Sequence, residues 1–229
     1  MRFSSELEKR KAAGFLTVIP DLKSKSPKEG DLFKGRELRE LAEALQSAGA
    51  PVLSVVTEPR HFEGTLTMLK EAAATGLPLL RKDFIKTEQD IEETAAAGAA
   101  AVLLIVSMLD EETLARLFAK CGSCGLDALV EVHNATELEI ANRLAPKLVG
   151  INNRDILRLE KDDGTVTNTG ILAPQVKRPA LVISESAISD REDVQMAGAA
   201  GADAVLVGTA LLQAADIGAK YRELQVILS

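Results

Sequence analysis

Short apolar runs rich in Val, Ile and Leu recur along the chain and alternate with charged stretches. Each run is continuous and does not alternate between apolar and polar residues, so each predicts a strand buried on both faces of a parallel sheet. The eight runs lie at residues 15–20, 51–56, 77–80, 100–106, 128–132, 148–151, 180–183 and 204–207.

The stretches between the runs predict helices. Residues 36–45 and 109–120 repeat Leu and Ala at helical spacing among charged residues. Several of these stretches end in a glycine just before the next run, where a helix C-cap favours a left-handed residue. The glycines are Gly49, Gly76, Gly98, Gly125 and Gly201.

Eight strands that alternate with helices in 229 residues predict an α/β fold, the (β/α)8 TIM barrel. The alternative is a doubly wound open sheet, which is less favoured because no G-x-G-x-x-G sequence follows the first run. No linker or low-complexity tract divides the chain. Residues 1–229 are therefore expected to form a single barrel domain with a short N-terminal segment, residues 1–14.

Charge and apolar length argue against several classes of partner. The chain has 27 Lys and Arg against 34 Asp and Glu, a net charge of -7 that disfavours binding to nucleic acid or to an anionic membrane. The longest apolar stretch, residues 95–109, is shorter than the roughly 20 residues that span a bilayer. The N-terminus lacks the apolar core of a signal peptide. We expect a cytoplasmic, monomeric protein that binds neither nucleic acid nor membrane.

Cysteine and histidine do not indicate a metal or redox centre. Cys121 and Cys124 form a C-x-x-C pair, but the pair follows a predicted helix, whereas a redox pair begins one. A zinc site would need two more ligands nearby, and the histidines are His61 and His133. We expect an incidental, reduced pair, with redox and metal roles as the alternatives.

Polar residues gather where the predicted strands end, which is where catalytic groups lie in this barrel. Because side chains alternate along a strand, several pairs of them share a face and converge on one cavity. These pairs are Asp21 and Lys23, Lys82 and Phe84, Glu131 and His133, and Asn152 and Arg154. For any one residue, a salt bridge or a cap at the barrel rim is the alternative. Three cations, Lys23, Lys82 and Arg154, around one mouth of an acidic protein indicate an anionic small molecule.

The last two runs end in S-E-S-A, residues 184–187, and V-G-T-A, residues 207–210. Their small residues are expected to expose backbone N–H groups at the starts of helices. Such groups bind phosphate, and the loops after the seventh and eighth strands are the usual phosphate site of this fold. We therefore expect a phosphorylated ligand.

Seven motifs occur in an order and at spacings that resemble one family. They are D-L-K-S-K-S-P, L-S-V-V-T-E, L-L-R-K-D-F-I, L-V-E-V-H, G-I-N-N-R-D, I-S-E-S and V-L-V-G. From about residue 15 to its C-terminus, the chain resembles indole-3-glycerol phosphate synthase of tryptophan biosynthesis. The resemblance implies ring closure of 1-(2-carboxyphenylamino)-1-deoxyribulose 5-phosphate with loss of CO2 and water, without a cofactor or metal.

The resemblance also implies catalytic roles for individual residues. Lys82 would be a principal general acid, and Glu131 the acid/base partner for the dehydration. Lys23 would contact the substrate anions and assist proton transfer. Asn152 and Glu185 would orient and polarise the sugar hydroxyls. Asp21 stands where the family usually has glutamate, in P-D-L-K instead of A-E-x-K, at a strand tip expected to face solvent.

The remaining implied contacts bind the two ends of the substrate. Lys23 and Arg154 would assist phosphate binding by Ser186, Ala187, Gly208 and Thr209. Phe84, with Phe62 and Ser54 as neighbours, would form the wall for the aromatic ring, and His133 is expected to be a rim residue. Ala187 replaces the glycine of the family's S-E-S-G.

The family commonly carries a longer N-terminal segment over the barrel mouth, whereas about 14 residues precede the first run here. Two alternatives to the synthase remain. One is another phosphosugar enzyme on the same barrel, such as an Amadori-type isomerase, and the other is a relative that only binds a phosphorylated ligand.

Overall fold

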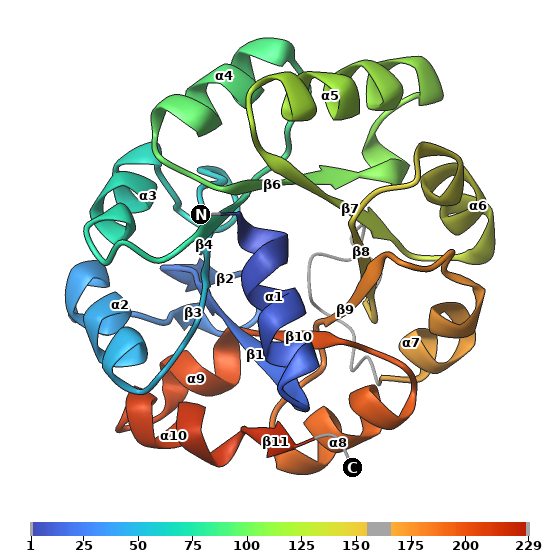
Figure 1. The fold of residues 1–229 in the computed structure, drawn as a ribbon. Coiled ribbons are helices and arrows are strands. Elements are labelled where there is room, and N and C mark those ends of the chain that lie inside the picture. Colours follow the sequence, from blue (N-terminus) through green and yellow to red (C-terminus); the bar gives the residue numbers. More distant parts are fainter. Residues whose placement is uncertain (1, 155–165, 228–229) are drawn as a thin grey trace.

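Eight parallel strands close into a ring in the computed structural model, which describes residues 2–154 and 166–227 (Figure 1). The ring closes because β10 pairs with β1, from Thr17 opposite Ala204 to Pro20 opposite Val207. The predicted (β/α)8 barrel is confirmed, and the open sheet is wrong. The strands are β1 (Phe15–Leu22), β4 (Leu53–Val56), β5 (Leu79–Lys82), β6 (Ala101–Ile105), β7 (Asp127–Val132), β8 (Leu148–Asn152), β9 (Leu181–Glu185) and β10 (Ala204–Val207).

Helices form an outer layer around the ring (Figure 1). All five glycines predicted at helix C-termini have positive φ, between 71° and 100°, so these predictions are confirmed. The helices are α2 (Leu38–Ser47), α3 (Leu66–Ala73), α4 (Glu88–Ala96), α5 (Glu111–Ser123), α6 (Ala135–Leu144), α7 (Thr167–Leu172), α8 (Arg191–Ala199), α9 (Thr209–Gln213) and α10 (Ile217–Glu223), with the 3-10 turns η1 (Val106–Met108) and η3 (Ala173–Gln175). No helix in the described ranges is both long and apolar enough to cross a membrane.

The N-terminal segment forms a helix, α1 (Phe3–Ala12), which lies across the middle of the ring in Figure 1. Phe3 and Leu7 are fully buried and join the apolar cluster inside the barrel. Asp127, at the start of β7, accepts a hydrogen bond from the Ser4 amide at 2.9 Å. Lys11 pairs at 2.7 Å with Asp203, just before β10. Helix α1 therefore covers the amino ends of the strands, opposite the mouth.

Three very short strands complete the fold. β2 (Lys25–Ser26) and β3 (Gly30–Asp31) pair with each other after β1, and β11 (Val226–Ile227) runs antiparallel to the start of β1. Two-residue strands leave no periodic signal in a sequence, which explains why they were not predicted.

The inward side chains change from apolar to charged toward the carboxyl ends of the strands. Ile19, Leu80, Leu129 and Ile183 belong to the apolar cluster inside the barrel. Two residues further along the same strands, the inward positions are Asp21, Lys82, Glu131 and Glu185. Because side chains alternate along a strand, each of these four lies on the same face as the apolar residue before it. The barrel thus places a charged layer directly on its apolar core.

Candidate active site

Charged and amide side chains from five strands meet in this layer. Lys82 Nζ lies 3.0 Å from Glu185 Oε2, although the two residues are 103 positions apart in the chain. Asn152 Nδ2 donates to Glu131 Oε1 at 3.2 Å. Asp21 lies 5% exposed, and Ser54 donates to it. The expectation that Asp21 faces solvent is therefore wrong.

The partly buried Lys82 and the fully buried Glu185 form an ion pair that shares its surroundings with two more carboxylates. Burial opposes the Lys82 charge, but Glu185, Asp21 and Glu131 outweigh it and raise the pKa of Lys82 above its ordinary value. Burial raises the pKa of Glu185 to about 7. The Lys82 charge lowers this pKa, whereas the Glu131 and Asp21 carboxylates raise it. Lys82 therefore remains an ammonium at neutral pH, while Glu185 titrates there.

Glu131 stays ionised in spite of its burial. Burial favours the neutral acid, but the contact with His133, the Lys82 charge and the Asn152 hydrogen bond hold the pKa of Glu131 below its usual value. The site therefore contains a partly buried ammonium and a buried carboxylate in one pocket, which are the forms that a general acid and a general base require.

Gly150, in β8, makes room for the Glu185 carboxylate. A Cβ atom at this position would lie 2.1 Å from Glu185 Oε1, far inside contact distance. The residue was not predicted as functional, although it stands in the G-I-N-N-R-D motif. A glycine within a strand often marks such a close approach, and that was the available signal.

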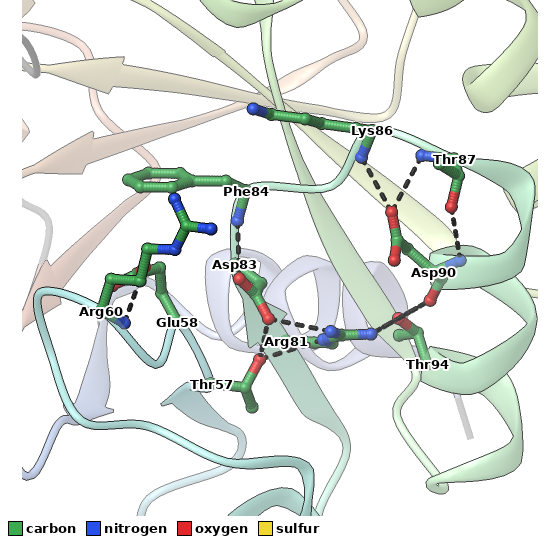
Figure 2. A network of polar contacts seen from close by, with 10 residues as sticks. All are labelled: Thr57, Glu58, Arg60, Arg81, Asp83, Phe84, Lys86, Thr87, Asp90 and Thr94. Carbon is green, nitrogen blue, oxygen red and sulfur yellow. Dashed lines mark hydrogen bonds and ion pairs between the residues drawn. The ribbon is translucent and has the colours of Figure 1, made fainter.

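Arg81 and Asp83, the neighbours of Lys82, belong to one polar network, with the Arg81 guanidinium at its centre (Figure 2). Arg81 Nε donates to Thr57 Oγ1 at 3.0 Å, and Nη2 donates to Asp83 Oδ2 at 2.8 Å. Asp83 Oδ1 in turn accepts from the Phe84 amide at 2.8 Å. Arg81 Nη1 donates to two oxygens of α4, Asp90 O and Thr94 Oγ1. The network fixes the strand end that carries Lys82 and Phe84.

One side of the pocket is apolar. Phe62 lies in the loop after β4, and the Glu58 carboxylate holds this loop by accepting from the amides of Arg60, His61 and Phe62 at 3.0, 2.7 and 3.3 Å. The apolar lining residues are Val56, Phe62, Phe84, Leu103 and Ile105. Ser54 does not line this pocket, because its side chain is fully buried and donates to Asp21 at 2.6 Å.

A second, more polar hollow adjoins the first. The two share Asp21, Lys23, Lys82, Arg154 and Ser186 as lining residues, so they form one continuous mouth. The predicted phosphate residues Ser186, Ala187, Gly208 and Thr209 all line the second hollow.

The two phosphate loops differ in structure. Thr209 begins α9 directly after Gly208, as predicted. The expectation that S-E-S-A opens a helix is wrong, because α8 begins at Arg191 and its amides are capped by the Asp190 side chain. Instead, Ser186 and Ala187 form a left-handed turn with φ of 68° and 57°.

Asn153, one of the polar residues at the strand ends to which the sequence assigned no role, supports that left-handed turn. Its Nδ2 donates to Glu185 O at 3.0 Å and to Ser186 O at 3.3 Å, and also to Ser184 Oγ. Its Oδ1 accepts from the Thr169 amide at 3.1 Å. The second asparagine of G-I-N-N-R-D thus ties the end of β9 to α7.

The cysteine pair lies away from this mouth, at the C-terminal end of α5. Cys121 and Cys124 are both free, and burial raises the pKa of Cys121 to about 12 with a contribution from Cys124. A raised thiol pKa is the opposite of what a redox or metal-binding cysteine needs. Among the described residues, no group of three or more potential His, Cys, Asp or Glu ligands is suited to hold a metal ion.

Nearly the whole chain matches one protein family, because a family model described as Indole-3-glycerol phosphate synthase covers residues 1–224. The chain belongs to the indole-3-glycerol phosphate synthase family. A relative of that name from Thermococcus kodakarensis is 47% identical over 201 residues, 87% of this chain and 87% of the relative. The Pyrococcus furiosus relative is 42% identical over 213 residues, 91% and 92% of the two chains. The resemblance drawn from the motifs is confirmed, and the chain is an enzyme of this family.

Solved structures of other phosphosugar enzymes share the fold. 3-Hexulose-6-phosphate synthase from Salmonella typhimurium superposes with a TM-score of 0.73, covering 91% of this chain and 96% of its own, at 14% identity. N-acetylmannosamine-6-phosphate 2-epimerase from Clostridium perfringens has a TM-score of 0.67, with 85% and 86% of the chains covered and 15% identity. At such low identity the likeness shows the barrel fold alone.

Proposed function

We propose that this member of the family is an indole-3-glycerol phosphate synthase that closes the indole ring of 1-(2-carboxyphenylamino)-1-deoxyribulose 5-phosphate with loss of CO2 and water. The observation that carries the proposal is the Lys82–Glu185 pair at 3.0 Å, in the same mouth as Glu131. An acid and a base are within reach of one substrate there, beside an apolar wall suited to an aromatic ring.

Two residues carry the proton transfers. The ring carbon that bears the carboxylate attacks the ketone carbon, and the ketone oxygen takes a proton from Lys82 as the carbon–carbon bond forms. CO2 then leaves, and its bonding electrons restore the aromatic ring. In the dehydration Lys82, reprotonated from solvent, gives a proton to the new hydroxyl, which leaves as water, while Glu131 accepts the proton of the neighbouring carbon. The ammonium of Lys82 and the carboxylate of Glu131 are the forms that these steps need.

The other residues of the mouth hold the substrate. Asn152 orients the sugar hydroxyls. Glu185 is fully buried, and it polarises these hydroxyls together with Lys82, with which it is paired. Lys23 binds the substrate anions, and the Asp21 carboxylate lines the same pocket. Phosphate is bound by the second hollow with help from Arg154, and its lining residues include Ser186, Ala187, Gly208 and Thr209. The benzoate ring lies against Phe62 and Phe84. Ser54 does not contact the substrate, but its hydroxyl donates to the Asp21 carboxylate.

The apolar wall also weighs against the Amadori-type isomerase, because a phosphosugar without an aromatic group has no use for five apolar lining residues. Retention of Lys82 and Glu131 in one pocket weighs against a role limited to ligand binding. We further propose that the enzyme works in the cytoplasm as a monomer, without a cofactor and without nucleic acid or membrane partners.

The purified protein supplied with the carboxyphenylamino-deoxyribulose phosphate tests this function. We expect indole fluorescence to rise together with release of one CO2 per indole formed. The Lys82→Met variant is the control for contaminating enzyme. A folded protein that forms no indole, or that isomerises a non-aromatic phosphosugar instead, would overturn the proposal.

A further inference from the structure

His133 lies between two carboxylates. Its Nε2 is 3.3 Å from Glu131 Oε1, an ion-pair distance without hydrogen-bond geometry. Its Nδ1 is 3.0 Å from Glu137 Oε2. The exposed fractions of the three side chains are 12% for His133, 1% for Glu131 and 14% for Glu137. The imidazole therefore connects the catalytic pocket to the first turn of α6.

The strand-to-helix turn determines this arrangement. Glu131 lies near the end of β7, and His133 directly follows the strand two residues later, so both point toward the same side. Asn134 caps α6, accepting from the Glu137 amide at 3.0 Å and donating to Glu137 Oε1 at 2.6 Å. The other oxygen, Glu137 Oε2, accepts from the His133 amide at 2.8 Å. With both oxygens held, the Glu137 carboxylate stays against the imidazole.

We propose that His133 is a positioning residue for Glu131: as an imidazolium held between Glu131 and Glu137, it keeps the Glu131 carboxylate ionised and oriented to accept a proton. The inference rests on the proposed function, in which Glu131 is the base.

The charges around Glu131 explain why a second cation is needed. The Lys82 ammonium, on β5, interacts with the Glu131 charge, but it also interacts with the charges of Glu185 on β9 and Asp21 on β1. From β8, Asn152 contributes only a neutral amide. The Lys82 ammonium thus interacts with three carboxylates, in a pocket that Lys23 and Arg154 also line, and a buried carboxylate takes up a proton where the positive charge around it is insufficient. The imidazolium of His133 adds positive charge 3.3 Å from Glu131 Oε1.

The groups around His133 favour its charged form. Glu131 faces it from β7 and Glu137 from α6, while Asn168 of α7 donates to its backbone carbonyl at 3.0 Å. Burial opposes the charge, but the two carboxylates outweigh burial and raise the pKa of His133 to about 10. Because the raised pKa belongs to a base, the imidazolium persists through neutral pH and is lost only as the pH rises toward that value.

Protonation of His133 can be observed directly, because the chain has two histidines. In the His61→Gln variant one imidazole remains, and its 15N shifts report tautomer and charge during a pH titration. We expect the His133 ring to be an imidazolium at about pH 8, and the Glu137→Gln change to lower its titration midpoint by about one unit or more. Glu139→Gln, on the exposed side of the same helix, should leave the midpoint unchanged. A ring that titrates near its ordinary value of about 6.5 would overturn the proposal.

Turnover measured against pH separates positioning from simple structural support. In His133→Gln the pKa of Glu131 should rise, which moves the acidic limb of the kcat profile upward by about 1 to 3 pH units and partly restores kcat at high pH. Glu137→Gln should match the wild type at about pH 6, because its His133 still carries the proton there. A loss of kcat in His133→Gln that is equal at every pH would refute the inference. If the wild type formed no indole, the function would fail, while the 15N titration would still decide the state of His133.

Discussion

Replacing Gly150 with alanine should misplace Glu185 with little other change. The added Cβ would lie 2.1 Å from Glu185 Oε1, and ordinary contact begins at 3.4 Å, so the oxygen must move by about 1.3 Å. Glu185 is fully buried, and its other oxygen lies 3.0 Å from Lys82 Nζ, so the shift disturbs the ion pair that holds Lys82. A displacement of about 1 Å at a catalytic group costs roughly 100-fold, and we expect kcat to fall by about that factor.

The assay is indole fluorescence under saturating substrate, with thermal unfolding measured on the same samples. The matched control is Gly170→Ala in α7, where the nearest atom to an added Cβ is Ala200 Cβ at 3.9 Å. That change should leave kcat intact and stabilise the helix by about 0.5–1 kcal/mol. A Gly150→Ala protein with wild-type kcat and melting temperature would refute the reasoning, because the carboxylate would then have moved without consequence.

Three further predictions concern the same mouth. Lys82→Met should lower kcat by about 100- to 10,000-fold, whereas Lys23→Met should mainly raise KM; steady-state kinetics with near-normal kcat for Lys82→Met would contradict this. Because Glu185 loses its proton as the pH rises through about 7, Glu185→Gln should remove an inflection near that pH from the kcat/KM profile, and its persistence would assign the ionisation elsewhere. Asn153→Asp replaces a donor to three oxygens with an acceptor, so urea unfolding should show a loss of about 1–3 kcal/mol, and an unchanged midpoint would count against the role of that amide.

Local periodicity in the sequence was enough to predict the barrel fold and the end of the strands at which the site lies. A parallel strand buried on both faces must be apolar throughout, so each of the eight strands left a visible run. Where a run ended in a polar residue, alternation showed which side chains face inward, as for Asp21 and Lys23 or Glu131 and His133. The motifs identified the family for the same reason, since residues at strand ends lie in short, contiguous stretches.

Contacts between strands that are distant in the chain were decided only by the tertiary structure. The pairing of Lys82 with Glu185 and the room that Gly150 leaves for that carboxylate both depend on the register of separate strands, about which local patterns are silent. Burial of Asp21 likewise depends on Ser54, in the neighbouring strand β4.

The same limit explains the misjudged loops. S-E-S-A has the composition of a helix start, but the bonds from Asn153 accompany a left-handed turn there, and the helix begins later at its own cap, Asp190. His133 looked like a rim residue because a strand pattern reports the face of a side chain and not its neighbours. His133 lies between Glu131 and Glu137 only because the chain turns from β7 into α6 at this point. The charge state of such a group depends on the charges that the fold places around it.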